Sequence, residues 1–157
     1  MKILCVCLGN ICRSPAAEGI LRYQINQKIQ SCPLEKGGRR GFLENISVDS
    51  AGTGSWHVGE PPDKRSTKVC HGHNIDISDQ RSRQLVSEDG EIFDLILCMD
   101  QSNIANAKDI IPSEYHHKIQ LFDNHEVNDP YYSLFDGFEI MFQQLERAAE
   151  RWIDLNQ

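Results

Sequence analysis

The stretch KILCVCLGNICRSP, residues 2–15, decides the fold of this 157-residue chain. Lys2–Val6 is a mostly apolar run, which is typical of a strand covered on both faces. A loop of about six residues follows, and residues 15–29 then place apolar side chains along one side of a helix. A buried strand, a tight loop and a helix in that order predict the first unit of an α/β fold with a parallel sheet.

The rest of the chain continues the alternation of short apolar runs with helical stretches. We expect a single domain, residues 1–157, with no internal repeat or linker. A glycine-rich, basic loop is expected over residues 31–41, and its role cannot be read from the sequence. Further strands are predicted at Ile46–Val48, Asp94–Met99 and Lys118–Phe122, and the first of these is ended by the segment that starts at Ser50. Further helices are predicted at 61–71 and Gly137–Leu155.

The composition excludes several classes of protein. Lys and Arg total 16 against 23 Asp and Glu, so the net charge of −7 argues against nucleic-acid binding. No apolar run approaches the roughly 18 residues of a membrane span. The N-terminal MKILCVCLGN lacks the long apolar core and cleavage site of a signal peptide. We therefore expect a cytoplasmic protein without membrane association, and a monomer is the default.

Three of the six cysteines fall within eight residues, which points to chemistry rather than to a disulfide framework. Their spacing also differs from the paired C-x2-C of structural zinc sites, so we expect no metal and no cofactor. The cysteines stand at positions 5, 7, 12, 32, 70 and 98.

The loop after the first strand has the residues of an anion cradle. Ser14 is suited to cap the helix and Pro15 to its first position. Gly9 and Asn10 tolerate the left-handed backbone that a tightly curled loop requires. Inward backbone N–H groups and the Arg13 guanidinium would hold a tetrahedral dianion. The predicted phosphate-binding residues are Leu8, Gly9, Asn10, Ile11, Cys12, Arg13 and Ser14.

Cys7 begins this loop at the carboxyl end of the strand. We expect a thiol that faces such a cradle to ionise readily and to attack the bound phosphorus, forming a phosphocysteine. The alternative is that Cys7 only fills space, as buried cysteines commonly do. The glycine and asparagine inside the loop and the Ser-Pro after it favour the catalytic interpretation.

VCLGNICRSP at residues 6–15 resembles the signature loop of the low-molecular-weight protein tyrosine phosphatases. The resemblance continues in family order over most of the chain, and it implies a three-layer fold with a four-stranded parallel sheet flanked by helices (flavodoxin-like order 2-1-3-4). The other matching segments are VDSAGT at 48–53, the pattern from Trp56 to Asp63, RQL at 83–85, the run from Phe93 to Asp100 with Ser102 and Asn103, and DPYY at 129–132.

The resemblance also implies roles. Cys7 would be the nucleophile, Arg13 the phosphate clamp, and Asp129 the general acid and later the base. Cys12 would be a redox partner able to form a disulfide with Cys7. Trp56, Tyr131 and Tyr132 resemble the walls of a substrate slot, although a tyrosine pair in a loop can also simply pack. The expected substrates are phosphotyrosine proteins, with a cognate tyrosine kinase among them.

Three other functions remain open at this stage. An arsenate reductase would share the fold but needs a relay of cysteines, for which Cys70 is the only mid-chain candidate. An arginine phosphatase would carry threonine where this chain has Ile11. A binding module without catalysis would not need Cys7, Arg13 and Asp129 together. The chain departs from the family at Gln80, near which a histidine often supports the loop asparagine; Ser50 and Asp100 are further candidates for supporting Asn10 and Arg13.

Overall fold

The computed structural model describes residues 1–32 and 38–155. Four parallel strands form one sheet in the order β2-β1-β3-β4, as the resemblance implied. The strands are β1 (Lys2–Cys7), β2 (Ser47–Gly52), β3 (Leu95–Cys98) and β4 (Ile119–Leu121). The helices are α1 (Arg13–Ser31), α2 (Gly38–Glu44), α3 (Lys64–Gly72), α4 (Asp89–Ile92), α5 (Gln101–Ile110), the 3₁₀ helix η1 (Ser113–Lys118) and α6 (Phe135–Leu155).

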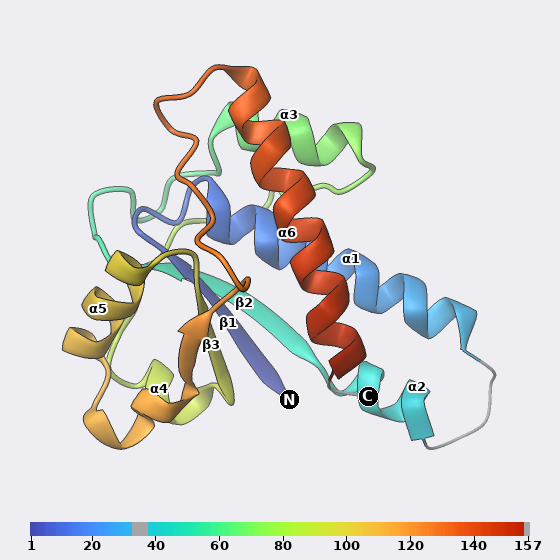
Figure 1. Cartoon of the computed structure of the whole chain (residues 1–157), viewed down its shortest axis with the longest axis horizontal. Coiled ribbons are helices and arrows are strands. Elements are labelled where there is room, and N and C mark those ends of the chain that lie inside the picture. The colour runs from blue at the N-terminus through green and yellow to red at the C-terminus, as the bar shows by residue number, and fades with distance from the viewer. Residues whose placement is uncertain (33–37, 156–157) are drawn as a thin grey trace.

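Helices cover both faces of the sheet, so the fold has three layers (Figure 1). Helices α1, α3 and α6 pack together on one face, whereas α4 and α5 lie on the other. Strand β1 runs through the middle and pairs with β2 on one side and β3 on the other. The β1–α1 loop therefore leaves the carboxyl edge of the sheet between two parallel neighbours, where open α/β sheets bind ligands.

Strand β1 is buried on both faces, as its unbroken apolar run predicts. Ile3, Cys5 and Cys7 point into the core shared with α1 and α6. Leu4 and Val6 point into the opposite core, which α5 covers. Because successive side chains of a strand alternate between faces, this one strand belongs to both cores and fixes the loop that follows it.

Several predicted boundaries differ from those of the structure. Strand β2 does not end at Ser50 but continues to Gly52, because Ser50–Gly52 pair with Cys5–Cys7 of β1. Helix α3 begins at Lys64 rather than at the two prolines, because the Asp63 carboxylate accepts a hydrogen bond from the Arg65 N–H and starts the helix there. Helix α6 begins at Phe135, two residues before the predicted start.

The predicted loop at residues 31–41 is wrong at its end. Residues 38–41 form the first part of α2, which buries Leu43 completely against the α1 side of the core. Residues 33–37 lie outside the described part of the chain. Helix α5 was not predicted as an element; the Asp100 carboxylate accepts from the Asn103 N–H and caps it.

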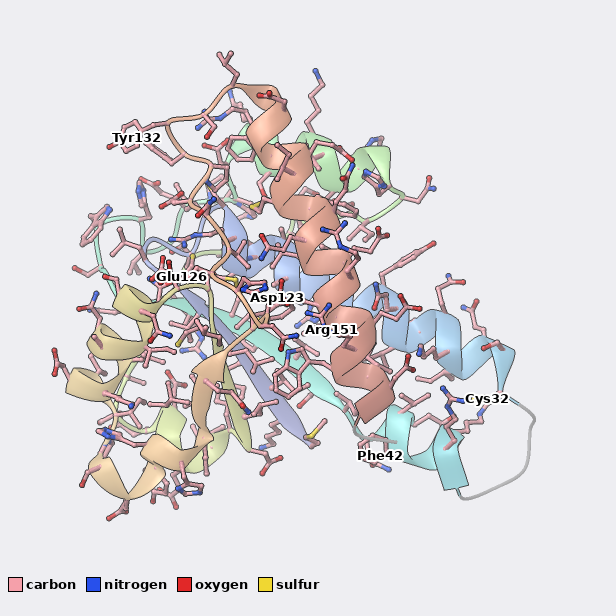
Figure 2. All side chains as sticks on the ribbon, viewed as in Figure 1. Cys32, Phe42, Asp123, Glu126, Tyr132 and Arg151 are labelled. Carbon is pink, nitrogen blue, oxygen red and sulfur yellow. The ribbon has the colours of Figure 1, made fainter. Side chains whose placement is uncertain are left out.

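Helix α6 carries the apolar face that its spacing predicts. Phe138, Met141, Phe142 and Leu145 are all buried in the core with α1. Near its far end, Arg151 forms an ion pair with Asp123, which follows β4 (Figure 2). Within residues 1–32 and 38–155, no helix has the length and apolarity to cross a membrane.

The buried face of α6 gives a test of the packing. Phe142 is fully buried and its ring stacks on His73 at 4.0 Å, so Phe142→Ala leaves a cavity between α6 and α3. We expect the free energy of unfolding to fall by about 3–5 kcal/mol in urea titrations. Ile140→Ala, on the same helix but 65% exposed, is the matched control and should change it by less than about 0.5 kcal/mol. Equal losses would contradict this packing.

Candidate active site

Four carbonyl groups of the β1–α1 loop are bonded outward, to residues of later segments, and these bonds hold the loop in a curl. The Leu8 carbonyl accepts from Gly54 N–H at 2.8 Å, and the Gly9 carbonyl from the Ser82 hydroxyl at 3.1 Å. The Ile11 carbonyl accepts from Asp63 N–H at 2.7 Å, and the Cys12 carbonyl from the Ser66 hydroxyl at 2.9 Å. In a trans peptide the N–H points opposite to the C=O, so the N–H groups that follow these carbonyls point into the curl.

Two local features allow this tight path. Asn10 adopts the left-handed conformation at φ 54°, as its residue type predicts; among non-glycine residues this is uncommon. Gly52 at the end of β2 lies against the loop backbone, and a Cβ atom there would meet the Leu8 carbonyl oxygen at 2.9 Å. A side chain at position 52 would therefore push the loop away from the sheet.

The Cys7 sulfur lies at the centre of the curl. It accepts a hydrogen bond from Asn10 N–H at 3.3 Å and lies 3.0 Å from the Ser14 hydroxyl oxygen. Asn10 Nδ2 donates to that oxygen at 2.8 Å, and the single hydroxyl proton of Ser14 has two acceptors in reach, the Cys7 sulfur at 3.0 Å and the Ala51 carbonyl at the longer distance of 3.4 Å. The sulfur therefore lies within hydrogen-bonding distance of two groups that can donate to it.

Behind the loop, buried polar side chains hold Asn10 in place. Asn10 Nδ2 also donates to Ser50 Oγ at 2.9 Å, and Asn10 Oδ1 accepts from Arg83 N–H at 3.0 Å. Ser50 in turn donates to Glu18 at 2.6 Å. Every hydrogen-bonding atom of the Asn10 amide thus has a partner, which fixes the strained residue.

The Glu18 carboxyl is buried, and burial raises its pKa although Ser50 and Arg22 act in the opposite direction. Desolvation disfavours the charged form of any carboxyl group, and the two compensating contacts do not fully offset it. Glu18 is one helical turn after Ser14, so both side chains face the loop from the same side of α1.

Arg13 reaches into the site from the first turn of α1 and is only 3% exposed. Its Nη1 donates to Asp100 at 2.6 Å and to the Val127 carbonyl at 3.0 Å, which confirms the predicted contact with Asp100. Its Nη2 donates to Asp129 at 3.2 Å. Burial opposes the charge, but Cys7 and the two carboxylates outweigh it and raise the pKa of the guanidinium, which stays protonated.

The segment before α6 places a carboxylate and two aromatic rings over the loop. Asp129 Oδ1 accepts from Tyr131 N–H at 3.1 Å, so the carboxylate is held within its own turn. The rings of Tyr131 and Tyr132 meet edge to face at 4.9 Å, and Tyr132 is 97% exposed, projecting from the fold in Figure 2. Trp56 also belongs to the lining, and its indole ring lies against Gly54, where a Cβ atom would collide with it.

These groups surround one pocket of about 350 Å³. The pocket brings together the predicted nucleophile, clamp, acid and aromatic residues, which come from three separate parts of the chain. It is lined by Cys7, Leu8, Gly9, Ile11, Cys12, Arg13, Trp56, His57, Asp129, Tyr131 and Tyr132. Within the described residues, no cluster of three or more His, Cys, Asp or Glu side chains has the arrangement to hold a metal ion.

A family model described as low molecular weight phosphotyrosine protein phosphatase matches residues 2–157. The chain belongs to this family. The human low molecular weight phosphotyrosine protein phosphatase is 36% identical over 161 residues, covering 98% of this chain and 94% of the human protein. A protein tyrosine phosphatase from Entamoeba histolytica, solved with Hepes in its active site, superimposes with a TM-score of 0.84 at 37% identity, covering 98% and 95% of the two chains.

Vibrio vulnificus Wzb, solved in complex with benzylphosphonate, superimposes with a TM-score of 0.80 at 31% identity, covering 98% of this chain and 97% of its own. The relatives are named as protein tyrosine phosphatases, so the family to which the chain belongs is one of hydrolases. The fold of the chain and its family agree with the expectation drawn from the signature loop and the DPYY segment.

Some residues of the phosphatase differ from expectation. Ser14 does not cap α1: the helix begins at Arg13, Cys12 occupies the cap position without a side-chain bond, and Pro15 is the third helical residue. The side chains of Ser14 and Asn10 lie behind the loop rather than on the pocket lining, because they bond to Cys7, Ser50 and each other, and the part of these two residues in phosphate binding stays a prediction. Gln80 donates to the Pro15 carbonyl at 3.1 Å and does not reach Asn10.

Sequence reasoning missed the residues that hold the loop from outside. Ser66, Ser82 and Asp63 bond its carbonyls, and His57 joins the lining while pairing with Glu60 at 2.6 Å. Ser66 and Ser82 lie 54 and 73 positions from the loop residues that they bond, so no local pattern points to them. Glu18 was detectable, since its position four after Ser14 places it on the same helical face.

The Glu18 carboxyl predicts a pH dependence of stability. Its folded pKa is raised, so the folded state binds this proton more tightly and loses stability as pH rises upward from the ordinary value of 4.5. Glu18→Gln removes that loss. We therefore expect the free energy of unfolding of Glu18→Gln, minus that of the wild type, to increase as the pH is raised from about 4 to 7, measured by urea titration at each pH. A constant difference across that range would contradict the assignment.

Proposed function

We propose that the protein hydrolyses phosphotyrosine in proteins, and small aryl phosphates, through a phosphocysteine formed at Cys7. The observation that carries the proposal is the position of the Cys7 sulfur beneath inward N–H groups, with Arg13 and Asp129 on the same pocket. Sulfur, clamp and acid then face one bound phosphoryl group from different sides, as an in-line displacement requires.

In the first step the Cys7 thiolate attacks phosphorus and the bond to the tyrosine oxygen breaks. The loop N–H groups and the Arg13 guanidinium stabilise the charge on the three spectator oxygens. Protonated Asp129 gives its proton to the departing phenolate, so the products are tyrosine and phosphocysteine. Ser14 stabilises the thiolate before the attack through its hydroxyl, 3.0 Å from the sulfur.

In the second step the Asp129 carboxylate takes a proton from water, which attacks the phosphorus of the phosphocysteine. The P–S bond breaks, inorganic phosphate leaves, and Cys7 returns as the thiolate while Asp129 is protonated again. One carboxyl group serves as acid and then base because it lies on the pocket side from which both the leaving group and the water approach.

The aromatic lining supports a flat substrate. Trp56, Tyr131 and Tyr132 line the pocket, and aromatic rings stabilise a bound phenyl group. The benzylphosphonate bound by the Vibrio relative combines an aromatic ring with a phosphoryl-like group, as an aryl phosphate substrate does. Phosphotyrosine proteins, among them a cognate tyrosine kinase, are therefore the proposed substrates.

The rival activities find less support in the pocket. A reductase relay needs a further reactive thiol beyond the loop pair Cys7 and Cys12, but the mid-chain candidate Cys70 is buried away from the lining, and burial raises its pKa to about 12. Ile11 lines the pocket where the resemblance places threonine in arginine phosphatases, and its apolar side chain suits an aryl group. The six free cysteines fit a reducing compartment, so the cytoplasm is the proposed location.

The role of Asp129 is tested by comparing leaving groups. Asp129→Ala should lower kcat/KM for a phosphotyrosine peptide by about 10²–10⁴-fold, the usual contribution of a general acid. For dinitrophenyl phosphate, whose phenolate leaves without a proton, kcat/KM should fall much less.

Cys7→Ser should abolish turnover of both substrates while phosphate binding persists, and EDTA should change the turnover of neither substrate. Equal losses on both substrates in Asp129→Ala would remove Asp129 from the acid role.

The paired loop cysteines give a redox prediction. Peroxide would oxidise Cys7 to a sulfenic acid, and the Cys12 thiol would displace water from it to form a disulfide. Burial raises the pKa of Cys12, so it remains a thiol until then. Mass spectrometry after mild peroxide should find a Cys7–Cys12 link that dithiothreitol reverses along with activity. Accumulation of sulfonic acid at Cys7 without the link would contradict this.

A further inference from the structure

The start of α3 is bonded to the phosphate loop through two residues. Asp63 N–H donates to the Ile11 carbonyl at 2.7 Å, and the Ser66 hydroxyl donates to the Cys12 carbonyl at 2.9 Å. Asp63 is largely buried, with 14% of its side chain exposed. The beginning of α3 is therefore a fixed point relative to the loop that holds the phosphate.

From this fixed point, Arg65 projects toward the segment that carries Asp129. Its guanidinium is held by the Asp63 carboxylate through two bonds, Nε to Oδ1 at 3.0 Å and Nη2 to Oδ2 at 2.9 Å. A bidentate pair of this kind fixes the plane of the guanidinium as well as its position. The remaining donor, Nη1, binds the Tyr131 carbonyl at 2.9 Å.

Ring contacts reinforce the same placement. The Arg65 guanidinium lies 4.5 Å from the centre of the Phe138 ring, which is fully buried in the first turns of α6. It also lies 5.5 Å from the centre of the Tyr131 ring. Arg65 is thus packed between α3, the Asp129 segment and the start of α6, and cation–π attraction favours that position.

These contacts complete a closed ring of interactions around the pocket. Arg13 binds Asp129, Asp129 binds the Tyr131 N–H, and the Tyr131 carbonyl binds Arg65. Asp63 then connects Arg65 back to the phosphate loop. In the proposed reaction the Arg13 guanidinium binds the phosphoryl oxygens. These oxygens compete with Asp129 for Nη2, so the Arg13–Asp129 bond is weakened when substrate is bound. The connection through Arg65 does not involve the phosphate and persists while the substrate is bound.

We infer that Arg65 is a positioning residue for catalysis, which holds the Asp129 carboxyl in register with the phosphate loop through the Tyr131 carbonyl. This inference rests on the proposed function, because it assigns Arg65 to the acid step of that reaction. Arg65 is absent from the pocket lining, so it acts through Asp129 and the Tyr131 wall rather than on the substrate. A displacement of about 1 Å at a catalytic group can cost a hundredfold in rate.

The test compares two aryl phosphates with the full-length protein. For Arg65→Ala, we expect kcat/KM for phenyl phosphate to fall about 10–100-fold more than kcat/KM for dinitrophenyl phosphate, because only the first substrate needs the proton. Weaker binding by the Tyr131 wall affects both aryl rings and cancels in this ratio. In an Asp129→Ala background, adding Arg65→Ala should leave the ratio unchanged.

Arg81→Ala is the matched control, because Arg81 is exposed and binds only backbone carbonyls of Ser78 and Gln80 among the contacts described. It should retain the wild-type ratio. If Arg65→Ala does not fold, Arg65→Lys carries the same test, since one ammonium group cannot reproduce the bonds to both Asp63 and Tyr131.

The outcomes separate this inference from the proposed function. If the wild type hydrolyses both substrates and Asp129→Ala changes their ratio, but Arg65→Ala does not, Arg65 is only structural and the inference is wrong. The inference is also wrong if Arg65→Ala changes the ratio of the two kcat/KM values equally in the wild-type and Asp129→Ala backgrounds. If the wild type lacks activity, or Cys7→Ser retains it, the proposed function itself is wrong.

Discussion

The structure depends on one constraint, which is that the backbone between β1 and α1 must present its N–H groups inward around a single sulfur. An isolated loop has no reason to adopt this path, because buried carbonyl groups without partners are costly. Here the carbonyls are bonded outward by Gly54, Ser82, Asp63 and Ser66, which come from three later segments. The anion cradle is therefore a property of the whole fold rather than of its signature sequence alone.

The same dependence explains why so much of the site is held by buried polar groups. Asn10 has a strained backbone, and such residues persist only where their surroundings fix them. The side-chain amide of Asn10 bonds to Ser14, Ser50 and the Arg83 N–H. Glu18 accepts from the Ser50 hydroxyl, and burial of its carboxyl group for this purpose carries a desolvation cost. Fixed donors at the position of developing charge need no rearrangement during the reaction.

How much the sequence could predict follows from the range of each interaction. The strand, loop and first helix were predictable because their signals are local: an apolar run, Gly9 and Asn10, then a helical pattern. The helical end of the 31–41 segment was not, because burial of Leu43 by the rest of the fold decides it. Ser14 has the chemistry of a helix cap, yet the sulfur of Cys7 and the amide of Asn10 bind its hydroxyl instead.

The candidate site divides in the same way. Cys7 and Arg13 could be placed from the loop between the first strand and helix, because their residue types are those that the chemistry demands there, whereas only the family resemblance singled out Asp129. Arg65 could not be found from its sequence, since an arginine beside an aspartate at a helix start is ordinary surface chemistry. Only the fold reveals that its Nη1 group reaches the carbonyl of a residue 66 positions away, close to the proposed general acid Asp129.

A crystal structure with bound vanadate tests the central claim most directly. The account predicts vanadium bonded to the Cys7 sulfur, with its equatorial oxygens on the loop N–H groups and on Arg13, and with Asp129 facing the apical oxygen. Vanadate bound elsewhere, or a loop whose N–H groups turn away from an oxyanion present at saturating concentration, would contradict it.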